Sequence, residues 1–482
     1  MRNIVKLYFL LILIVAIMAG CKDEPIPEPD PEEEQEQEQE KEEAPVETQK
    51  VNQFIEDGMD LYYLWYKEMP DIDIRYEFDS EAYFDKLLYE EDRWSGITDD
   101  VEALLNSFEG KETSYGYSIA FGRFSNTGNI FGLVEFVYPN TPAAEAGLKR
   151  GDILVLLDNG DITDDNYMQL LNGESISLSL GILGDEGISV GESVTMTSKE
   201  LNLNPIVKTE IVEHEGHKIG YLFYAQFINN YNTSLDTAFQ HFLDEQVTDV
   251  VIDLRYNPGG RVTAAQHLCS SIAPASVVNG NKLLITYQYN DNLEEHYRQN
   301  DVSQLEMKFN SNVPVKMGLD KVYFLTGTGT ASASEFTITG LNPYMNVTTV
   351  GETTFGKYTG SFTLKPEYIY ENQSYYNDFN NWGIQPIVLR YANSLGITDF
   401  KDGFAPDIPV EDDIFAALPL GDKNEPLFKA AIEDITGSEV IAMKSAKRNV
   451  PDYHIFDRGF SKFDENKRNL LIDNIDKDKL LK

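Results

Sequence analysis

The feature that most constrains the fold is an alternation of apolar strands and helical stretches in the second half of the chain. Short apolar runs typical of buried strands cover Ile219 to Phe227, Val247 to Leu254 and Lys321 to Thr326. Between them, apolar residues recur at helical spacing over Ser234 to Glu245 and Ala264 to Ile272. Strands that alternate with helices indicate a mixed α/β core, because each apolar sheet face needs a helix to cover it.

The preceding segment reads as a small helical domain. Between residues 51 and 110, Phe54, Leu61 and Leu64 recur at three- and four-residue steps, and Tyr83 and Leu87 do so again. We expect this domain to serve packing rather than chemistry.

Residues 111–205 change to short strands and contain TPAAEAGLKRGDIL, Thr141 to Leu154. Pro142 can begin a short helix that Gly147 ends, and an apolar strand follows. This pattern resembles a PDZ domain, an α+β fold. The resemblance implies that a peptide strand adds beside a sheet edge and that its carboxylate meets the loop of Tyr115, Gly116 and Tyr117. Tyrosines stand here where the family's loop has smaller apolar residues.

The N-terminus is typical of an export signal. Arg2 and Lys6 precede the apolar run Leu7 to Ala19, which is shorter than the ~20 residues of a transmembrane helix. Cys21 follows Ala-Gly, which resembles the lipobox of bacterial lipoproteins and implies a lipidated Cys21. An ordinary cleaved signal with an incidental cysteine is the alternative.

Residues 22–50 carry 13 acidic and 3 basic side chains, so we expect an extended, disordered tether. Lys22, Asp23 and Glu24 resemble a signal that exports some Gram-negative lipoproteins to the cell surface. Their alternative reading is simply the first charges of the tether.

The overall charge argues against several functional classes. The 482 residues include 80 acidic and 39 basic side chains, for a net charge of −41, which would repel a nucleic-acid partner. Two cysteines, Cys21 and Cys269, are too few for a disulfide framework or a cysteine-based zinc site. The close pair His214 and His217 is a weak metal signal by itself. Cys269 lies in an apolar helical stretch, and we expect a buried, non-catalytic thiol.

Three segments of the α/β core carry chemistry-bearing residues. VVIDLRYNPGG ends in paired glycines that expose backbone N–H groups, and TGTGTASASEF places serines at a strand-to-helix junction. VGETTFGKYTG contains Lys357 after Gly356. Each segment alone is more simply a turn, a helix cap or a surface charge.

Together the three segments resemble the C-terminal processing peptidases, also called tail-specific proteases. That family has a serine nucleophile within Ser-Ala-Ser-Ala-Ser-Glu and a lysine base in a downstream Gly-Lys. The resemblance covers about residues 51–415, and its order of PDZ domain, Asn-Pro-Gly-Gly turn, serine and lysine is kept here. It implies a core of the ClpP/crotonase-like type, a Ser332 nucleophile and a Lys357 base. It implies neither a metal ion nor an organic cofactor.

The chemistry assigns roles to the neighbouring residues. A serine hydroxyl needs an adjacent base, and a lysine can be that base only when it is neutral. The tetrahedral oxyanion needs two backbone donors, which by the family's geometry are the N–H groups of Ala333 and Gly259. Ser361 stands where many relatives have a glutamine that orients the lysine, and Glu335 is the alternative orienter.

Two alternatives within the enzyme reading remain open. Ser334 could replace Ser332 as nucleophile, although the 25-residue spacing to Lys357 favours Ser332. A histidine base, His214 or His217, would follow the tricorn-type relatives.

We therefore predict a multidomain α/β serine endopeptidase of the cell envelope that cleaves protein substrates near their C-termini. A PDZ domain would recruit or gate the substrate. The alternative function is a non-catalytic peptide-binding lipoprotein on a degenerate protease fold. We expect a lipid anchor outside the cytoplasm, at the outer membrane or at the cell surface, and the sequence leaves the oligomeric state open. The predicted parts are a signal peptide (1–21), a tether (22–50), a helical domain (51–110), a PDZ domain (111–205), a peptidase core (206–437) and a peripheral segment (438–482).

Overall fold

A computed structural model describes residues 41–184, 187–416, 418–440, 450–459 and 470–473. The chain divides into two units, residues 1–42 and 43–482, and the helices and strands described below all lie in the second. The predicted signal peptide, Cys21 and residues 22–40 of the predicted tether lie outside the described residues. No helix within the described ranges combines the length and apolarity that a membrane crossing requires.

The N-terminal helices are α1 (Val46–Tyr62), α2 (Ser80–Leu87) and α3 (Val101–Ser107). Because α1 begins at Val46, residues 46–50 are helical, and the predicted tether was too long at this end. The buried face of α1, with Phe54 and Met59, belongs to the same apolar cluster as strands of the α/β core. The predicted helical region is therefore present, but it shares its core with the α/β core instead of forming a separate domain.

Residues 111–202 form a strand-rich segment with two short helices. Its main sheet has the order β22-β3-β4-β5-β7-β8, in which β22 is Tyr453–Gly459 from the far end of the chain, and β2 and β9 pair separately. Pro142 is the first residue of α4, and Gly147 follows that helix with a φ of 81°, as the sequence predicts. The elements are β2 (Lys111–Ser114), β3 (Tyr117–Phe124), β4 (Ile130–Val137), α4 (Pro142–Glu145), β5 (Ile153–Leu157), α5 (Gln169–Asn172), β7 (Ser175–Gly184), β8 (Gly187–Thr197) and β9 (Lys199–Asn202).

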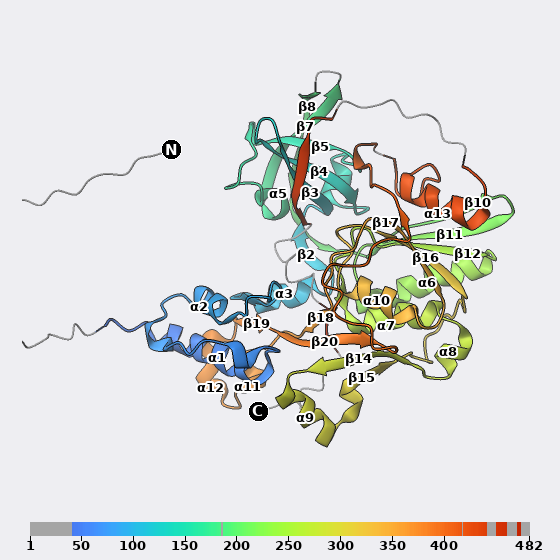
Figure 1. Cartoon of the computed structure of the whole chain (residues 1–482). Helices are drawn as coiled ribbons and strands as arrows, with labels where there is room; N and C mark the ends of the chain where they lie inside the picture. The colour runs from blue at the N-terminus through green and yellow to red at the C-terminus, as the bar shows by residue number, and fades with distance from the viewer. Residues whose placement is uncertain (1–40, 185–186, 417, 441–449, 460–469, 474–482) are drawn as a thin grey trace, which may run out of the picture. The chain divides into compact units, whose positions relative to one another are not determined.

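The α/β core contains two six-stranded sheets (Figure 1). The first has the order β10-β11-β12-β16-β17-β21, in which β11 to β21 run parallel and β10 is antiparallel to β11. The second has the order β13-β23-β18-β20-β14-β15. The first sheet contains β10 (Ile206–His214), β11 (His217–Tyr224), β12 (Asp249–Asp253), β16 (Lys321–Thr326), β17 (Asn346–Gly351) and β21 (Ile408–Pro409). The second contains β13 (Gly260–Arg261), β14 (Leu283–Tyr289), β15 (Glu306–Lys308), β18 (Thr359–Ser361), β20 (Ile387–Asn393) and β23 (Leu470–Leu471).

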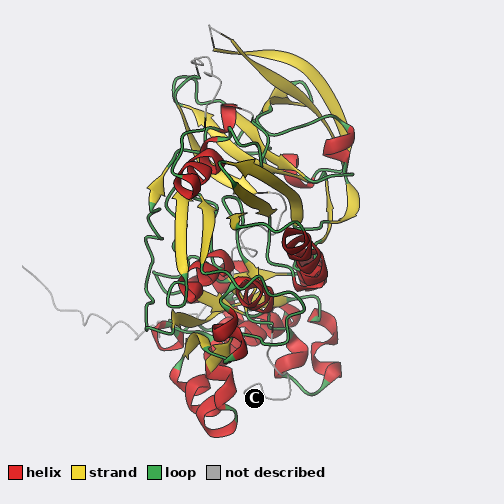
Figure 2. Cartoon of the chain, turned by 90° about the vertical axis from the view of Figure 1, so that its right-hand side faces the viewer, coloured by secondary structure: helices red, strands yellow, loops and turns green. Residues whose placement is uncertain are grey.

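Successive side chains of a strand point to opposite faces of the sheet, so each face packs against its own set of helices. Leu222 and Phe324 point into the cluster shared with α7 (Val262–Ile272), α10 (Ala333–Leu341) and the second sheet. Tyr221 and Tyr323 point to the opposite face, where α13 (Pro426–Thr436) packs. The helices α7 and α10 thus lie between the two sheets, with α13 outside the first (Figure 1). In Figure 2, strands predominate in the upper part of the view and helices in the lower part.

The segment predicted to be peripheral, 438–482, contributes two strands to the sheets of the fold. Strand β23 lies between β13 and β18, and Leu470 within it is fully buried. Strand β22 (Tyr453–Gly459) pairs with β3 at the edge of the strand-rich segment, where Figure 1 draws it in red. The prediction of a peripheral tail was therefore wrong for both strands, because the partners of each are far away in the sequence.

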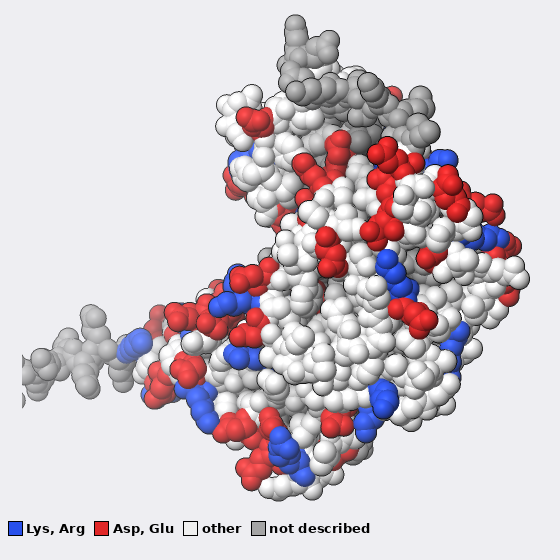
Figure 3. Space-filling view, turned by 45° about the vertical axis from the view of Figure 1, so that its right-hand side comes forward, with Lys and Arg blue, Asp and Glu red and all other residues white. Residues whose placement is uncertain are grey.

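The surface keeps the acidic character of the sequence. On the face shown in Figure 3, acidic side chains gather both toward the upper part and at the lower left, whereas basic side chains are scattered. Within the described residues, no group of three or more His, Cys, Asp or Glu side chains is arranged to hold a metal ion.

Candidate active site

Ser332 occupies a strained position between β16 and α10. It directly precedes α10 with φ 59° and ψ −109°, a backbone conformation that non-glycine residues rarely adopt. Such a conformation costs roughly 1–3 kcal/mol and persists only where surrounding contacts impose it. A sharp strand-to-helix turn of this kind points the serine side chain out of the regular structure, as a nucleophile requires.

The Ser332 hydroxyl is buried and faces the backbone N–H of Glu335 in a capping box, without a hydrogen bond of normal geometry among the described residues. Its backbone N–H, in contrast, donates to the Glu335 carboxylate at 2.9 Å. A buried hydroxyl without a well-formed hydrogen bond is uncommon and needs an explanation, because its desolvation is not compensated. The neighbouring Ser334 hydroxyl donates to the Asn257 carbonyl at 3.1 Å, so that serine already has a structural contact.

The Asn257–Gly260 turn packs against Ser332. Gly259 has a φ of 117°, and a Cβ placed on it would lie 2.7 Å from the Ser332 Cβ and 3.0 Å from the Ala333 nitrogen. Only glycine therefore allows this approach. The Gly259 N–H donates to the Asn257 side chain at 2.9 Å. The two predicted oxyanion residues thus meet beside the serine, although the N–H of Gly259 already has an acceptor.

Glu335 joins the serine and lysine segments. Its fully buried carboxylate accepts from the backbone N–H groups of Ser332 (2.9 Å), Gly356 (2.7 Å) and Lys357 (2.8 Å) and from the Thr354 hydroxyl (2.6 Å). Burial raises the pKa of Glu335 to about 7, although these hydrogen bonds oppose the rise. The sequence identified Glu335 as an alternative orienter, and it contacts Lys357 through the backbone N–H.

Tyr391 makes a second connection between the same two segments. Its buried hydroxyl lies 3.2 Å from the Ser332 carbonyl and 3.0 Å from the Lys357 carbonyl. Sequence reasoning missed this tyrosine, which lies on β20 without any local motif. Ser332 and Lys357 are therefore held together by one carboxylate and one hydroxyl.

The Ser332–Lys357 hydrogen bond itself is not formed. The Ser332 hydroxyl has no well-formed hydrogen bond in the described part of the chain, and the fully buried Lys357 places its Nζ 5.3 Å from the centroid of the Trp94 ring. The Ser361 hydroxyl, the other predicted orienter, is also buried without a partner among the described residues. The backbones of the two candidate residues are therefore joined through Glu335 and Tyr391, while no hydrogen bond joins their side chains.

A cavity of about 380 Å³ borders the serine loop. Thr328, Gly329 and Ala331 line it directly before Ser332, and Phe355 lines it two residues before Lys357. The opposite wall comes from residues 455–458 of β22. A larger cavity of about 740 Å³ lies beside β4, α4 and β10, and neither Ser332 nor Lys357 lines it. The smaller cavity is therefore the one next to the candidate chemistry.

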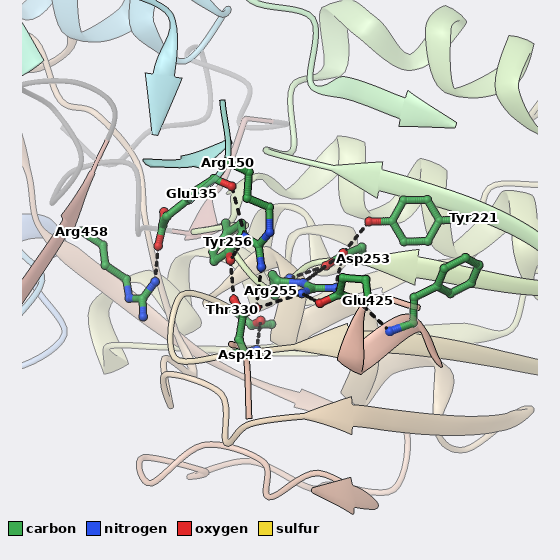
Figure 4. Close-up of polar contacts among 12 residues, drawn as sticks. Glu135, Arg150, Tyr221, Asp253, Arg255, Tyr256, Thr330, Asp412, Glu425 and Arg458 are labelled. Carbon is green, nitrogen blue, oxygen red and sulfur yellow. Dashed lines mark hydrogen bonds and ion pairs between the residues drawn. The ribbon is translucent and has the colours of Figure 1, made fainter. Parts of the chain in front are cut away.

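A buried charged network supports the turn that leads to Gly259 (Figure 4). Arg255 donates to Asp253 at 3.0 Å, to Glu425 at 2.6 and 2.9 Å and to Asp412 at 3.1 Å. Arg150, from the strand-rich segment, contacts the same Asp412 at 2.6 Å. Burial would raise the pKa of Asp412, but the two guanidinium groups lower it to about 2.

Tyr256 also joins this network, since its hydroxyl contacts both Arg150 and Asp412. Because Arg255 and Tyr256 directly precede Asn257, the network links the strand-rich segment to the candidate oxyanion turn. Sequence reasoning missed it, although a charged pair at the end of an apolar strand is a signal for buried ion pairing.

The predicted peptide-binding loop has its two tyrosine rings inside the strand-rich segment. The hydroxyls of Tyr115 and Tyr117 donate to the carbonyls of Gly173 and Leu170 at 2.5 and 2.6 Å, and both rings are buried. Gly116 between them has a φ of 82°. The tyrosine side chains therefore tie the loop to the end of α5, which leaves the loop backbone as the part able to meet a carboxylate.

The remaining candidates lie apart from the serine. His214 and His217 pair across the β10–β11 turn, and His217 Nδ1 lies 2.8 Å from Asp249 at the start of β12. The Gly259 turn follows the other end of β12, so the topology does not bring these histidines to the serine. Cys269 is buried in α7, and burial raises the pKa of its thiol to about 12, which disfavours a reactive thiolate.

Comparison with known proteins gives two family matches. Residues 218–410 match peptidase family S41, and residues 50–96 match the peptidase S41 N-terminal domain. A carboxyl-terminal-processing protease of Synechocystis sp. is 27% identical over 312 residues, which cover 64% of this chain and 65% of that protein. A carboxy-terminal processing protease of Bacillus subtilis is 24% identical over 392 residues, covering 78% and 75% of the two chains. A solved structure of a Bacteroides fragilis protein described as an S41 protease superposes with a TM-score of 0.65 at 28% identity, covering 80% of this chain and 97% of that one.

Proposed function

Because the chain belongs to the C-terminal processing peptidases of family S41, we propose that it is a serine endopeptidase with a Ser332–Lys357 dyad. Family membership supports serine-type peptidase activity. The observation that carries the dyad is that the Glu335 carboxylate and the Tyr391 hydroxyl each contact both Ser332 and Lys357.

In the proposed reaction, neutral Lys357 takes the proton of the Ser332 hydroxyl as the serine oxygen attacks the substrate carbonyl carbon. The oxyanion accepts hydrogen bonds from the N–H of Ala333 and from the Gly259 turn, whose N–H first exchanges its bond to Asn257. Protonated Lys357 then donates to the leaving amine, and water hydrolyses the acyl-enzyme. The hydroxyl becomes reactive when the Lys357 side chain rotates from the Trp94 ring toward Ser332.

The decisive experiment measures peptidase activity of the purified chain and of variants at both dyad positions. Ser332→Ala and Lys357→Ala should lose activity, and Lys357→Arg should be nearly as inactive because a guanidinium does not accept a proton. Ser334→Ala and Lys365→Arg are matched controls, since the Ser334 hydroxyl contacts a carbonyl and Lys365 pairs with Glu367 at 3.1 Å. Full activity of Lys357→Arg would exclude the dyad.

The proposed substrates are proteins cleaved near their C-termini, as the names of the relatives suggest. We propose that residues 111–205 are a PDZ domain that recruits or gates them, and that the core is of the ClpP/crotonase-like type. The strand-rich sheet with α4 and α5 supports the first assignment. The open dyad favours the alternative of a non-catalytic binding protein. A wild-type chain that cleaves no peptide at any pH would support that alternative.

We also propose a lipid anchor at Cys21 outside the cytoplasm, with the acidic residues after it as the spacer. Metabolic labelling with a fatty-acid probe should mark the wild-type chain and Cys269→Ser, but not Cys21→Ser. Equal labelling of all three chains would contradict the anchor. Display at the cell surface additionally requires that external protease cut the protein on intact cells.

A further inference from the structure

The edge of β3 already carries a strand from the far end of the chain. Strand β22 pairs with β3 antiparallel from Tyr453, opposite Phe124, to Gly459, opposite Ile119. The two strands are more than 300 positions apart in the sequence, so this pairing is a tertiary contact and not a hairpin. Without β22, the backbone N–H and C=O groups along this edge of β3 would lack strand partners.

One aromatic side chain of β22, Phe456, packs between β3 and the segment leading to α5. The ring centroid of Phe456 lies 6.5 Å from that of Phe121 on β3 and 5.5 Å from that of Tyr167, two residues before α5. The Arg123 guanidinium lies 5.3 Å above the same ring. Phe456 is still 38% exposed, so the contact holds the strand without burying it in the core.

The same strand also contacts β4 and borders the cavity beside Ser332. Arg458 forms an ion pair with the buried Glu135 on β4 (Figure 4). Residues 455–458 form one wall of the 380 Å³ cavity that Thr328 and Ala331 line from the other side. One strand therefore occupies the β3 edge and borders the space next to Ser332.

We propose that the β3 edge is a binding site for an extended peptide with an aromatic side chain, and that β22 is its resident intramolecular competitor. This inference rests on the proposed PDZ assignment of residues 111–205. Such domains bind by adding an antiparallel strand to a sheet edge, with main-chain bonds for affinity and side-chain pockets for specificity. Strand β22 has this arrangement, and its C-terminal end points along β3 toward the Tyr115–Tyr117 loop.

Competition between β22 and an added peptide for the β3 edge determines whether a substitution in β22 strengthens or weakens peptide binding. A peptide binds only the fraction of molecules in which β22 has left β3, so its apparent dissociation constant exceeds the intrinsic one by the inverse of that fraction. Loss of the Phe456 ring contacts weakens the resident strand and enlarges the open fraction. The aromatic pairs seen here predict about tenfold tighter peptide binding for Phe456→Ala.

The binding test uses the full chain with Ser332→Ala, so that no probe is cleaved. The probe is a fluorescent peptide with the sequence of residues 451–459, and fluorescence anisotropy gives its affinity. Phe456→Ala in the chain should tighten binding about tenfold, whereas the control His454→Ala, an exposed residue on the same strand, should not. A probe with alanine in place of its own phenylalanine should bind Phe456→Ala about tenfold more weakly than the native probe.

Hydrogen exchange on the Ser332→Ala chain, with Phe456 intact, gives a second measurement. Saturating peptide should deprotect the amides of 453–459 while β3 stays protected, because the peptide replaces β22 on that edge. Equal affinities of Phe456→Ala and His454→Ala, or unchanged exchange in 453–459, would overturn the proposal. Binding is read without catalysis, so an inactive wild-type enzyme would refute the dyad and leave this inference standing.

Discussion

Replacing Glu335 by glutamine tests whether its carboxylate positions the two halves of the dyad. One carboxylate oxygen accepts from the N–H groups of Ser332 and Lys357, and the other accepts from the Gly356 N–H and the Thr354 hydroxyl. A glutamine amide has only one acceptor oxygen. The better orientation places the amide oxygen where it accepts from the N–H groups of Ser332 and Lys357. The NH₂ group then donates to the Thr354 hydroxyl but faces the Gly356 N–H, which is also a donor and therefore loses its acceptor.

The structure gives the magnitude of two opposing effects on stability. A hydrogen bond to a charged group contributes about 1.5–3 kcal/mol, and the neutral amide removes one such bond and weakens the others. Against this, the uncharged amide avoids the desolvation of the buried carboxylate, which leaves the pKa of Glu335 raised to about 7 even with these hydrogen bonds in place. The two effects nearly cancel, so Glu335→Gln should change the unfolding free energy little at pH 8.

The expected effect of Glu335→Gln on catalysis is not offset by a second, opposing effect. The Gly356 N–H is adjacent to Lys357, and a displacement of about 1 Å in a reacting group costs roughly 100-fold. We therefore expect kcat/KM of Glu335→Gln to fall by about 100-fold at pH 8 while stability is nearly unchanged. The matched control is Glu367→Gln, in which a half-exposed carboxylate paired with Lys365 is neutralised in the same way.

The pH dependence of stability supplies an independent check. The folded pKa of Glu335 is raised above its ordinary value of 4.5, so its contribution to stability is fully present below pH 4.5 and is lost as pH rises through 7. Relative to Glu335→Gln, the wild-type chain should lose about 3 kcal/mol of unfolding free energy across that range in urea titrations. Activity within threefold of wild type, or a pH-independent difference between the two proteins, would refute the reasoning.

Two further predictions concern the supports of the oxyanion turn. Gly259→Ala should abolish activity and lower the unfolding free energy by more than ~1 kcal/mol, because its Cβ would lie 2.7 Å from that of Ser332. Gly216→Ala is the matched control, with a φ of 83° and open space around its Cβ. Asp412→Asn should destabilise the fold by about 2–3 kcal/mol at pH 7, the amount that corresponds to the lowered pKa of Asp412, since it leaves the Arg150 and Arg255 charges under-compensated. Because the folded pKa of Asp412 is lowered to about 2, the wild-type advantage over Asp412→Asn in unfolding experiments should persist above pH 4 and vanish as pH falls through 2.

The parts of the fold that the sequence predicts depend on local patterns. Alternation along β11 and β16 places Leu222 and Phe324 on one face and Tyr221 and Tyr323 on the other, and this period is readable in the sequence. The strand-to-helix junction at Ser332 is likewise marked by its run of small residues. Such a period can be read from residues a few positions apart, although the faces that it defines pack against distant elements.

The missed parts depend on partners distant in the sequence. Strand β23 is two residues long, too short to show a period, and its burial comes from insertion between β13 and β18. The first turn of α1 is hidden in an acidic stretch, because the apolar residues that stabilise the helix begin only at Val51. Arg255 meets Glu425 across 170 positions, which no local spacing can indicate.

The open state of the dyad follows from the balance of the contacts at Lys357 and Ser332. Contact between a lysine ammonium and a tryptophan ring contributes about 0.5–2 kcal/mol. An unpaired buried hydroxyl costs about 1–3 kcal/mol, which a bond to Lys357 would recover. These magnitudes are similar, so the ring contact by itself does not hold Lys357 strongly away from Ser332. Glu335 and Tyr391 already hold the backbones of both residues, so closing the dyad requires rotation of the Lys357 side chain and no rearrangement of the sheets. If a peptide displaces β22 as proposed, the lining of the cavity beside the same loop changes.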